Sequence, residues 1–460
     1  MTGKIDIVFK NPKGIPVTVI GAGISGLYAA KWLAKLGAEV KISELRKLAE
    51  LPKDFLEQIA AENIFLETGC HSESIVLSSQ LIVVSPGVPE TIPVLKKARS
   101  LGIPIIGEIE LACRFIDIPI IAVTGTNGKS TVTSMIGEIV NISGLNAFIG
   151  GNLGIPFTSV LLEENFRPEI AVLEISSFQL DTTFSFKPKV GILLNITPDH
   201  LDRYSSFEDY IASKTLMFKL QDKGDIAIIN DDDEIARNVP LPEGVTVLRY
   251  GRNYRPGLSA FISGDSVRMI DPTMKEWSIK PGQAIKGHNV ENLMAAALAA
   301  KAIGIAESFV KKAAENFKGL QHRLEYVANW KGIDFYNDSK ATNVDSAVKA
   351  VSGFDKQIIL IAGGKHKGSS YERLAHACKN KVKKAILLGE ARDLIANDLK
   401  NTTEIMFVNS MEEAVKEAAD IASAGDIVLL SPACSSFDMF DNYPHRGKVY
   451  CDAVKKIING

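Results

Sequence analysis

Cysteine is scarce in this chain, and the positions of the few cysteines exclude two kinds of stabilising site. The 460 residues include five cysteines, and no two of them form a C-x-x-C pair. A structural zinc site would need cysteines paired at such short spacing, and a disulfide framework would need a denser set in a short secreted chain. We therefore expect reduced thiols and a cytoplasmic protein.

Long hydrophobic runs and an excess of one charge are also lacking. No apolar stretch approaches the roughly 20 residues that span a bilayer, and residues 1–19 do not have the layout of a signal peptide. The formal net charge is −2, so broad electrostatic binding to nucleic acid or to an anionic membrane is not expected. Hydrophobic residues at 46% and charged residues at 23% instead indicate a soluble globular protein. Its length suggests roughly two to four domains.

The most informative stretch, residues 118–140, reads IPIIAVTGTNGKSTVTSMIGEIV. An apolar, β-rich run is followed by a glycine turn and then by apolar residues at helical spacing. A strand, a glycine turn and Lys-Ser-Thr at a helix start form the layout of a phosphate-binding loop, whose backbone N–H groups face the anion. We expect a nucleotide to be bound by Gly125, Thr126, Asn127, Gly128, Lys129, Ser130 and Thr131.

The side chains of this loop suggest separate roles. The ammonium group of Lys129 would reach the terminal phosphates, and the hydroxyl of Ser130 is placed for Mg²⁺. The full pattern carries a further glycine where this chain has Val123, so a glycine turn that merely starts a helix is the simpler alternative. Lys-Ser-Thr directly at the helix start favours nucleotide binding over that alternative.

A second glycine turn, residues 21–26, follows an apolar strand near the N-terminus and fits G-x-G-x-x-G. Glu44 follows about twenty residues later, as the acidic residue does in dinucleotide-binding proteins. Taken alone, this pattern would favour an NAD-dependent oxidoreductase, although it does not tell whose phosphate the backbone approaches. Ser85 directly follows another apolar run, 81–84, at the kind of strand end where ligands of α/β sheets bind.

Strands and helices alternate along the chain, which favours α/β domains with mainly parallel sheets. We place the domain boundaries near residues 116 and 320. The three expected domains are residues 1–116, 117–320 and 321–460. Residues 206–220 are expected to form a helix capped by Ser206, with core contacts from Tyr210, Ile211, Leu216, Met217 and Leu220.

Several polar groups follow apolar runs in the middle of the chain. Glu174 ends a buried-looking strand and could bind Mg²⁺, with a solvated strand-end carboxylate as an equal alternative. Residues 195–202, NITPDHLD, end another strand and are rich in groups that bind metals or form hydrogen bonds. Lys214 would ordinarily be a solvated surface lysine. Asn289 and Asn292 share a helix face and could cap that helix or contact a purine.

The order of the motifs resembles that of the Mur ligases, and the matching segments reach across nearly the whole chain. These segments are TGTNGKST, LEISSFQL, NITPDHLDRY, YIASKTLMF, GHNVENLMAA, GLQHRLE, NDSKATN and SPACSSFDMFDNYPHRG. Three of them, SSFQL, NDSKATN and SPACSSFDMF, look like the members that add D-glutamate. The D-N-P-R signature of the members that add meso-diaminopimelate is absent.

This resemblance implies a fold, an activity and a set of ligands. The fold would be α/β with three domains: a Rossmann-like UDP-binding domain, a central P-loop ATPase domain with a mainly parallel sheet, and a C-terminal Rossmann-like domain. The activity would be ATP-dependent amide formation between UDP-N-acetylmuramoyl-L-alanine and D-glutamate through an acyl phosphate, in peptidoglycan precursor synthesis. The cofactors would be ATP and two Mg²⁺ ions, and the enzyme would be a monomer without nucleic-acid or membrane partners.

The resemblance also assigns roles to individual residues. The catalytic residues would be Lys129, Glu174, His200, Lys214 and Lys340. Both Mg²⁺ ions would be held by Ser130, Glu174, His200 and Lys214, with Lys214 carbamylated so that a carboxylate-like group replaces a cation. Further nucleotide contacts would come from Asn289, Asn292, Arg323 and Asp338. The substrates would be bound by Ile24, Ser25, Glu44, Ser85, Asn152, Thr342, Lys367, Ser436 and Tyr443.

Three departures from the family pattern concern the amino-acid site. Residues 363–367 offer two lysines where one is expected, and we assign the role to Lys367 rather than Lys365. Tyr443 stands where phenylalanine is expected, and Pro444-His445 before Arg446 is also unusual.

Two rival functions belong to other classes. An oxidoreductase built on residues 21–26 would leave the phosphate loop and Glu174 unexplained. A nucleotide-binding regulator would bind ATP without making an amide. Within the family, the competitors add L-alanine to the UDP-sugar or glutamate to folate, and the folate enzymes lack a domain like residues 1–116.

Overall fold

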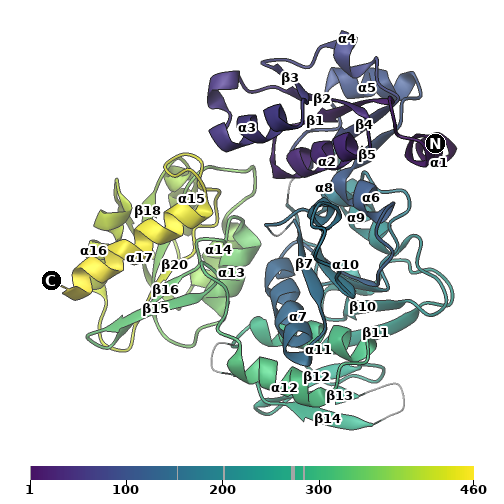
Figure 1. The fold of residues 1–460 in the computed structure, drawn as a ribbon. Coiled ribbons are helices and arrows are strands. Elements are labelled where there is room, and N and C mark those ends of the chain that lie inside the picture. The colour runs from purple at the N-terminus through teal and green to yellow at the C-terminus, as the bar shows by residue number, and fades with distance from the viewer. Residues whose placement is uncertain (1, 153, 200–202, 271–274, 283–284, 460) are drawn as a thin grey trace. The chain divides into compact units, whose positions relative to one another are not determined.

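The computed structural model describes residues 2–152, 154–199, 203–270, 275–282 and 285–459. These residues form three β-sheets flanked by helices (Figure 1). The chain divides into two compact units, and the first unit contains the first two sheets. The first unit comprises Met1–Ile196, Ser206–Ile279 and Leu293–Ala313, and the second comprises Thr197–Ser205, Lys280–Asn292 and Ala314–Gly460.

The first sheet has five parallel strands in the order β3-β2-β1-β4-β5. The strand order reverses between β1 and β4, so the glycine turn after β1 opens at a topological switch point, where α/β sheets bind ligands. The strands are β1 (Pro16–Ile20), β2 (Glu39–Glu44), β3 (Phe65–Thr68), β4 (Leu81–Val84) and β5 (Ile105–Gly107). The helices are α1 (Thr2–Lys10), α2 (Ile24–Lys35), η1 (Leu48–Glu50), α3 (Lys53–Ala61), α4 (Glu73–Val76), α5 (Pro93–Ser100) and α6 (Glu108–Cys113).

The second sheet has the order β14-β13-β12-β11-β10-β9-β6-β8-β7. Its strands run parallel from β7 to β12, and β13 and β14 continue it antiparallel. The strands are β6 (Ile120–Thr124), β7 (Ala147–Gly151), β8 (Ile170–Glu174), β9 (Val190–Leu193), β10 (Ile226–Asn230), β11 (Thr246–Gly251), β12 (Ala260–Ser263), β13 (Ser266–Ile270) and β14 (Glu276–Ile279). The helices are α7 (Lys129–Ser143), η2 (Phe157–Leu161), α8 (Ser177–Leu180), α9 (Phe207–Thr215), η3 (Leu216–Phe218), α10 (Glu234–Arg237), α11 (Asn289–Ala302) and α12 (Glu307–Asn316).

The third sheet has the order β15-β16-β20-β17-β18-β19, with the edge strand β15 antiparallel to β16 and the other neighbours parallel. Its strands are β15 (Glu325–Trp330), β16 (Ile333–Asn337), β17 (Ile358–Gly363), β18 (Val382–Leu388), β19 (Glu404–Phe407) and β20 (Ile427–Leu430). The helices are α13 (Val344–Ser352), α14 (Glu372–Cys378), α15 (Arg392–Leu399), α16 (Met411–Ile421) and α17 (Tyr443–Asn459).

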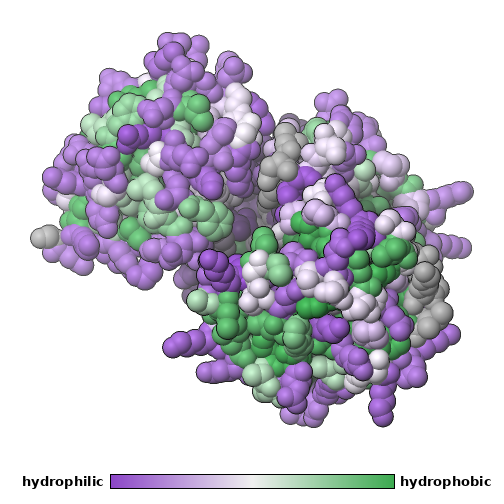
Figure 2. Space-filling view, turned by 90° about the horizontal axis from the view of Figure 1, so that it is seen from above, coloured by the Kyte–Doolittle hydropathy of each residue, from purple (hydrophilic) through white to green (hydrophobic). Residues whose placement is uncertain are grey.

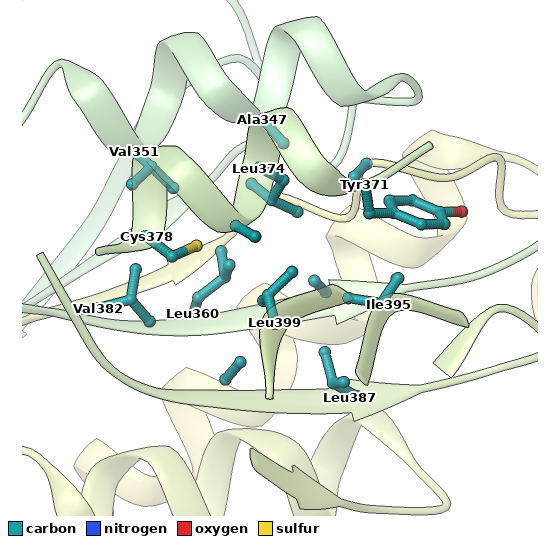
Figure 3. Packing of buried hydrophobic residues seen from close by; sticks show 14 of the residues in the cluster. Ala347, Val351, Leu360, Tyr371, Leu374, Cys378, Val382, Leu387, Ile395 and Leu399 are labelled. Atoms are coloured by element: carbon teal, nitrogen blue, oxygen red, sulfur yellow. The ribbon is translucent and has the colours of Figure 1, made fainter. Parts of the chain in front are cut away.

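The continuous apolar run of β17 is explained by burial on both faces of the third sheet. Ile358 and Leu360 point into a core shared with α13, α14 and α15 (Figure 3), and Ile359 and Ile361 point into a second core with α16 and α17. Successive residues of a strand face opposite sides, so a strand covered by helices on both sides is apolar throughout. Each such side chain contributes roughly 1.5–3 kcal/mol to stability when it leaves water.

The face of the molecule drawn in Figure 2 is mainly polar. On the face shown in Figure 2, hydrophilic residues cover much of the surface, and hydrophobic residues occur in smaller patches between them. Among the residues that the structure describes, no helix combines the length and the apolar character that crossing a membrane requires.

The predicted α/β class with mainly parallel sheets is confirmed, and one predicted helix is shorter than expected. The cap at Ser206 is confirmed, because its Oγ accepts a hydrogen bond from the amide of Asp209 at 3.1 Å. The helix α9 ends at Thr215, however, and a 3₁₀ turn follows. Leu220 therefore lies beyond the helix and is 39% exposed, so its predicted core contact is wrong, whereas Phe218 is buried.

Strands β3, β7 and β15 are among those that were not predicted from the sequence. The burial patterns of β3, β7 and β15 show mostly half-buried positions, and β7 ends in two glycines. Such segments carry neither a clear apolar alternation nor a continuous apolar run. Only pairing with a neighbouring strand identifies them.

Two glutamates of α6 are buried in the first unit. Thr158 of η2 donates to Glu108 Oε1 from its amide, at 2.5 Å, and from its hydroxyl, at 2.7 Å. The amides of Phe184 and Ser185 each donate to Glu110 Oε2 at 2.8 Å. Burial raises the pKa of Glu108 to about 7, although the hydrogen bonds from Thr158 lower it.

The raised pKa of Glu108 predicts a pH-dependent stability. Its ordinary value is 4.5, so stability that is fully present below pH 4.5 is lost as the pH rises through about 7. Glu108→Gln imitates the protonated side chain. We expect wild type to lose roughly 3 kcal/mol more unfolding free energy than this variant as the pH rises through the titration of Glu108. Urea unfolding at pH 5 and pH 8 measures it, and an equal change in stability for variant and wild type would contradict the prediction.

Candidate active site

The phosphate loop follows β6 and has backbone conformations that require glycine. Gly125 has a φ of +149°, and an added Cβ would lie 3.0 Å from Leu194 Cβ and 3.2 Å from Asn195 O. Gly128 precedes α7 in the left-handed region, with a φ of +88°. Other residues rarely adopt these conformations. The loop therefore turns sharply from strand to helix, and the positive end of the α7 dipole lies at the turn.

Two side chains from outside the loop hold it in place. Asn195, two residues after β9, accepts from the amide of Asn127 at 2.8 Å and donates to its carbonyl at 3.0 Å. The hydroxyl of Tyr210 in α9 lies 3.2 Å from that of Thr126. Since β9 pairs directly with β6, the end of one strand supports the loop that follows the other.

Two lysines converge on one carbonyl oxygen of the loop. The ammonium groups of Lys129 and Lys214 each donate to Gly125 O at 2.9 Å, and Lys129 also donates to Thr126 O at 2.9 Å. Lys214 is only 2% exposed and lies 4.6 Å from the ring centroid of Tyr210, so it is not the solvated surface lysine that its sequence context suggests. Two cations near the loop amides make this region strongly attractive to phosphate.

Glu174 lies at the end of the strand next to the loop. Its register partner in β6 is Val123, and its side chain is 3% exposed. Asn152 donates to its Oε1 at 2.7 Å. Glu174 is therefore a buried carboxylate held by an amide, and the alternative of a solvated strand-end carboxylate is wrong.

Ser130, Thr131 and His200 were also predicted to contribute to this region, and the structure describes the first two of them. Ser130 and Thr131 are buried in the first turn of α7. His200 lies outside the described residues. No cluster of three or more His, Cys, Asp or Glu side chains suited to a metal ion occurs within the described ranges. Mg²⁺ needs no such cluster when substrate phosphates and water complete its coordination.

The first glycine turn and Ser85 are in contact in the structure. Ser85 Oγ donates to Gly21 O at 3.2 Å. A Cβ on Gly21 would lie 2.9 Å from Ser85 Cβ, and one on Gly26 would lie 2.1 Å from Gly21 O. Ile24 and Ser25 begin α2 directly after the turn, and Ile24 is 55% exposed. This close packing leaves no room for a side chain at Gly21 or Gly26, so only glycine fits at these two of the three glycine positions.

Glu44 contacts the same glycine turn through the backbone of Ala22. Its Oε2 accepts from the amide of Ala22 at 2.6 Å and from the guanidinium of Arg46 at 3.0 Å. Although burial raises the pKa of Glu44, the hydrogen bonds from Arg46 and Ala22 and the Arg46 charge lower it to about 2. The carboxylate is therefore ionised at any physiological pH and fixes the loop that a ligand would meet.

In the second unit, the loops after β16, β17 and β20 meet because these strands are parallel neighbours. Asp338 follows β16 and accepts from Ser431 Oγ, after β20, at 3.0 Å and from the amide of Leu324 at 3.2 Å. Burial raises the pKa of Asp338 to about 7, although these bonds and the Arg323 charge lower it.

The residues predicted for the amino-acid site lie on these loops and on α17. The ammonium of Lys340 lies 4.0 Å from the ring centroid of Tyr443. Ser436 is buried, and the amide of Thr342 donates to Lys340 O at 2.7 Å. Lys367 is close enough to Cys434 for its charge to lower the pKa of a thiol that burial raises to about 11.

The two asparagines of α11 contact each other. Asn292 Nδ2 donates to Asn289 Oδ1 at 3.0 Å, and both residues are buried. Their shared helix face is confirmed, and this bond fixes the orientation of both amides.

No individual functional role was predicted from the sequence for four residues that the structure singles out. Asn195 and Tyr210 support the phosphate loop, Asn337 donates to Glu325 Oε2 at 3.0 Å, and Arg446 is buried beneath the loops of the third sheet. Asn195 lies inside the NITPDHLD segment, so position after a strand was a usable signal. The other three lie in the segments YIASKTLMF, NDSKATN and SPACSSFDMFDNYPHRG, which carry the family resemblance but were given no supporting role at these positions.

Three family models match consecutive parts of the chain. Residues 16–107 match the Mur ligase MurD-like N-terminal domain, residues 123–300 match the Mur ligase middle domain, and residues 322–434 match the Mur ligase glutamate ligase domain. The matches occur in the same order as the three sheets.

Curated relatives match over almost the entire chain. A protein of Koribacter versatilis named UDP-N-acetylmuramoylalanine--D-glutamate ligase is 42% identical over 97% of this chain and 98% of its own length. A protein of Acidobacterium capsulatum with the same name is 41% identical over 96% of both chains.

Solved structures share the fold at low identity. The UDP-N-acetylmuramate-alanine ligase MurC of Thermotoga maritima gives a TM-score of 0.60 at 18% identity, covering 96% of this chain and all of that one. A pseudomurein peptide ligase type C of Methanothermus fervidus gives a TM-score of 0.61 at 20% identity, covering 96% and 99%.

The support of the phosphate loop by Asn195 can be tested directly. Asn195→Ala removes both hydrogen bonds to the backbone of Asn127, each worth roughly 1 kcal/mol. We expect ATP binding, measured by titration calorimetry, to weaken about tenfold. Asn146→Ala is the matched control, because Asn146 is exposed and donates to Arg167 O. Equal ATP affinity in the two variants would contradict the role of Asn195.

Proposed function

Because this chain belongs to the Mur ligase family, we propose that it joins D-glutamate to UDP-N-acetylmuramoyl-L-alanine in an ATP-dependent reaction of peptidoglycan precursor synthesis. The observation that carries this proposal is the end-to-end likeness to relatives named for this activity, at 42% identity over 97% of the chain. The site geometry agrees with it, since a phosphate loop, two lysines and a buried carboxylate meet at one strand edge.

Each sheet would bind one reactant. Residues 1–116 would hold the UDP moiety through the turn after β1, with Ile24, Ser25, Glu44 and Ser85 around it. Residues 117–320 would hold ATP on the phosphate loop, and Asn152 would contact the muramoyl-alanine end. Residues 321–460 would bind D-glutamate. In support, the first turn is built for close backbone approach and the second ends in the Lys129–Thr131 helix start.

The first step transfers a phosphoryl group. The alanyl carboxylate attacks the γ-phosphorus of ATP, the bond to the β-phosphate oxygen breaks, and an acyl phosphate and ADP form. Both reactants are anionic, so their approach needs positive charge. Lys129 and the amides of the phosphate loop would supply it at the phosphates, where charge develops during transfer.

The second step forms the amide. The amine of D-glutamate attacks the acyl carbon, a tetrahedral intermediate forms, and phosphate leaves as the carbon–oxygen bond breaks. The amine loses a proton in this step. Lys340, Thr342, Lys367, Ser436 and Tyr443 would bind the two carboxylates of D-glutamate and so orient its amine toward the acyl carbon.

The residues around the phosphate loop fit Mg²⁺. A buried hydroxyl at Ser130 and a buried carboxylate at Glu174 are oxygen donors of the kind that Mg²⁺ takes alongside phosphate and water. When bound, the ion would neutralise phosphate charge. Ser130 and Glu174 would hold one ion, and His200 and Lys214 would serve the second.

Carbamylation of Lys214 would suit its position. Its ammonium is buried against the loop, where a cation would repel Mg²⁺. Reaction with CO₂ gives a carbamate that carries a negative charge and keeps one N–H on the lysine nitrogen. That N–H can still donate to Gly125 O, so the modification preserves the contact that the structure has.

Asn289, Asn292, Arg323 and Asp338 would make further contacts with the nucleotide. We also propose that the enzyme acts as a monomer in the cytoplasm. The five cysteines are free thiols in the structure, which suits a reducing compartment.

The substrate assignment is tested by phosphate release. With ATP, Mg²⁺ and UDP-N-acetylmuramoyl-L-alanine, we expect release with D-glutamate and a matching amide product by mass spectrometry. L-glutamate, L-alanine, L-lysine and meso-diaminopimelate should give none. Lys129→Ala should remove most turnover and still bind the UDP substrate. Release with another amino acid alone would keep the ligase chemistry and discard the assignment of Lys367, Ser436 and Tyr443.

The carbamate at Lys214 is tested by chemical rescue. Lys214→Ala should lose most activity, and a short carboxylate such as acetate should restore part of it by supplying the missing anion. Lys219→Ala is the control, because Lys219 is an exposed lysine five residues away. Full activity of Lys214→Ala without any addition would show that no carbamate is needed.

A further inference from the structure

Arg446 is a buried cation at the strand ends of the third sheet. It lies in the first turn of α17 and is 2% exposed. Burial lowers the pKa of Arg446 to about 10, although the nearby Cys434, Asp438 and Asp338 raise it. The guanidinium is therefore charged at neutral pH, and a charge buried in this way needs compensating hydrogen bonds.

The compensation comes from the loops that carry the predicted amino-acid site. Nε donates to Ser339 Oγ at 3.0 Å, and Nη2 donates to Ser339 O at 2.8 Å and to Cys434 O at 3.1 Å. Nη1 donates to Ser435 O at 3.2 Å and to Gly363 O at 3.5 Å. The acceptors are backbone oxygens and one hydroxyl rather than carboxylates, so the contact organises chain segments.

These acceptors belong to the ends of three neighbouring strands. Ser339 follows β16, Gly363 ends β17, and Cys434 and Ser435 follow β20. Lys340 and Ser436 directly follow Ser339 and Ser435, and Lys367 lies four residues after Gly363. All three are among the residues proposed to bind the carboxylates of D-glutamate. One planar guanidinium with five N–H donors thus joins three loops that would share a ligand.

The loop after β20 has a second anchor on its far side. Asp438 Oδ2 accepts from the amide of Glu390, after β18, at 2.9 Å. A β-bridge between Lys365 and Ser435 also joins the loop after β17 to the loop after β20, with the amide of Lys365 donating to Ser435 O at 2.9 Å. Figure 3 shows the hydroxyl of Tyr371 at the edge of the adjacent core, and it lies 3.0 Å from Cys434 Sγ. The loop is therefore fixed from several directions, with Arg446 beneath it.

We propose that Arg446 is a positioning residue for the amino-acid substrate: it sets the separation of the groups on three loops that bind the two carboxylates. This inference rests on the proposed function. Two carboxylates on one small molecule demand a fixed spacing of their partners, because charged hydrogen bonds weaken quickly with misplacement. A lysine at this position could not make all five contacts, since its single ammonium has three donors and no planar fork.

The first test compares Arg446→Lys with wild type in the amide-forming assay. We expect the KM for D-glutamate to rise about tenfold, equivalent to about 1.4 kcal/mol, and the KM for ATP to change several-fold less. Arg392→Lys is the matched control, because Arg392 lies in the same sheet domain and its Nη1 contacts Asn409 Oδ1 at 3.4 Å. A KM for D-glutamate within twofold of wild type would overturn the inference, as would an equal rise for ATP.

A milder variant covers the case in which Arg446→Lys does not fold. Ser339→Ala removes the hydroxyl that accepts from Nε and donates to Tyr443 O at 2.9 Å, and it leaves the other four contacts of Arg446. We expect a severalfold rise in the KM for D-glutamate with an unchanged melting temperature. Arg446→Ala should also raise the KM for D-glutamate. Added guanidinium should lower the KM of this variant again, whereas sodium chloride at the same concentration should not. Unchanged KM values in Ser339→Ala would contradict the role of Arg446.

Amide hydrogen exchange separates this inference from the proposed function. In Arg446→Lys, amides of residues 364–368 and 431–438 should exchange faster while those of β17 and β20 stay protected. If wild type makes no amide with D-glutamate, the proposed function fails, and the substrate part of the inference fails with it. Unchanged exchange in an active enzyme would overturn the positioning role alone.

Discussion

Parallel strands all end at the same edge of their sheet, and this constraint organises the whole molecule. In each of the three sheets most of the described site residues lie at the carboxyl ends of neighbouring strands: β1 and β4, then β6, β8 and β9, then β16, β17 and β20. Helices cover both faces of such sheets, so the strands are apolar throughout and the chemistry collects where they stop. Segments far apart in the sequence therefore supply one site.

Backbone conformation decides what these edges can bind. At Gly125 and Gly21 the chain turns with positive φ, and neighbouring atoms occupy the space that a Cβ would need. The turn brings amide groups to the surface of the site instead of side chains. Phosphate is bound well by such amides at a helix start, which accounts for the recurrence of glycine turns after β1 and β6.

Buried charged side chains are the second feature that the sites share. Lys214, Glu174, Asp338 and Arg446 are each at most 8% exposed, and each has a hydrogen bond that offsets part of its desolvation. Their environments differ: Lys214 donates to one carbonyl of the phosphate loop, whereas Arg446 donates to oxygens at the ends of three strands. The first arrangement suits chemistry at a phosphate, and the second suits the holding of loops.

The amino-acid sequence by itself determined the α/β class, the strands and helices with continuous apolar or periodic patterns, and both glycine turns. These features are local, because an apolar strand, a glycine turn and a helix start are read within about twenty residues. The motif order resembling the Mur ligases likewise lay in the sequence. Leu220 shows the limit, since the end of α9 depends on packing that no local pattern records.

Only the tertiary structure decided which groups share a site. Asn195 and Asn127 lie 68 residues apart, and Arg446 lies 107 residues from Ser339, yet each pair is joined by hydrogen bonds. A lysine in a helix and an arginine near a chain end carry no sign of burial in the sequence. Strand pairing brings their partners to one edge, and burial there turns ordinary surface residues into fixed charges.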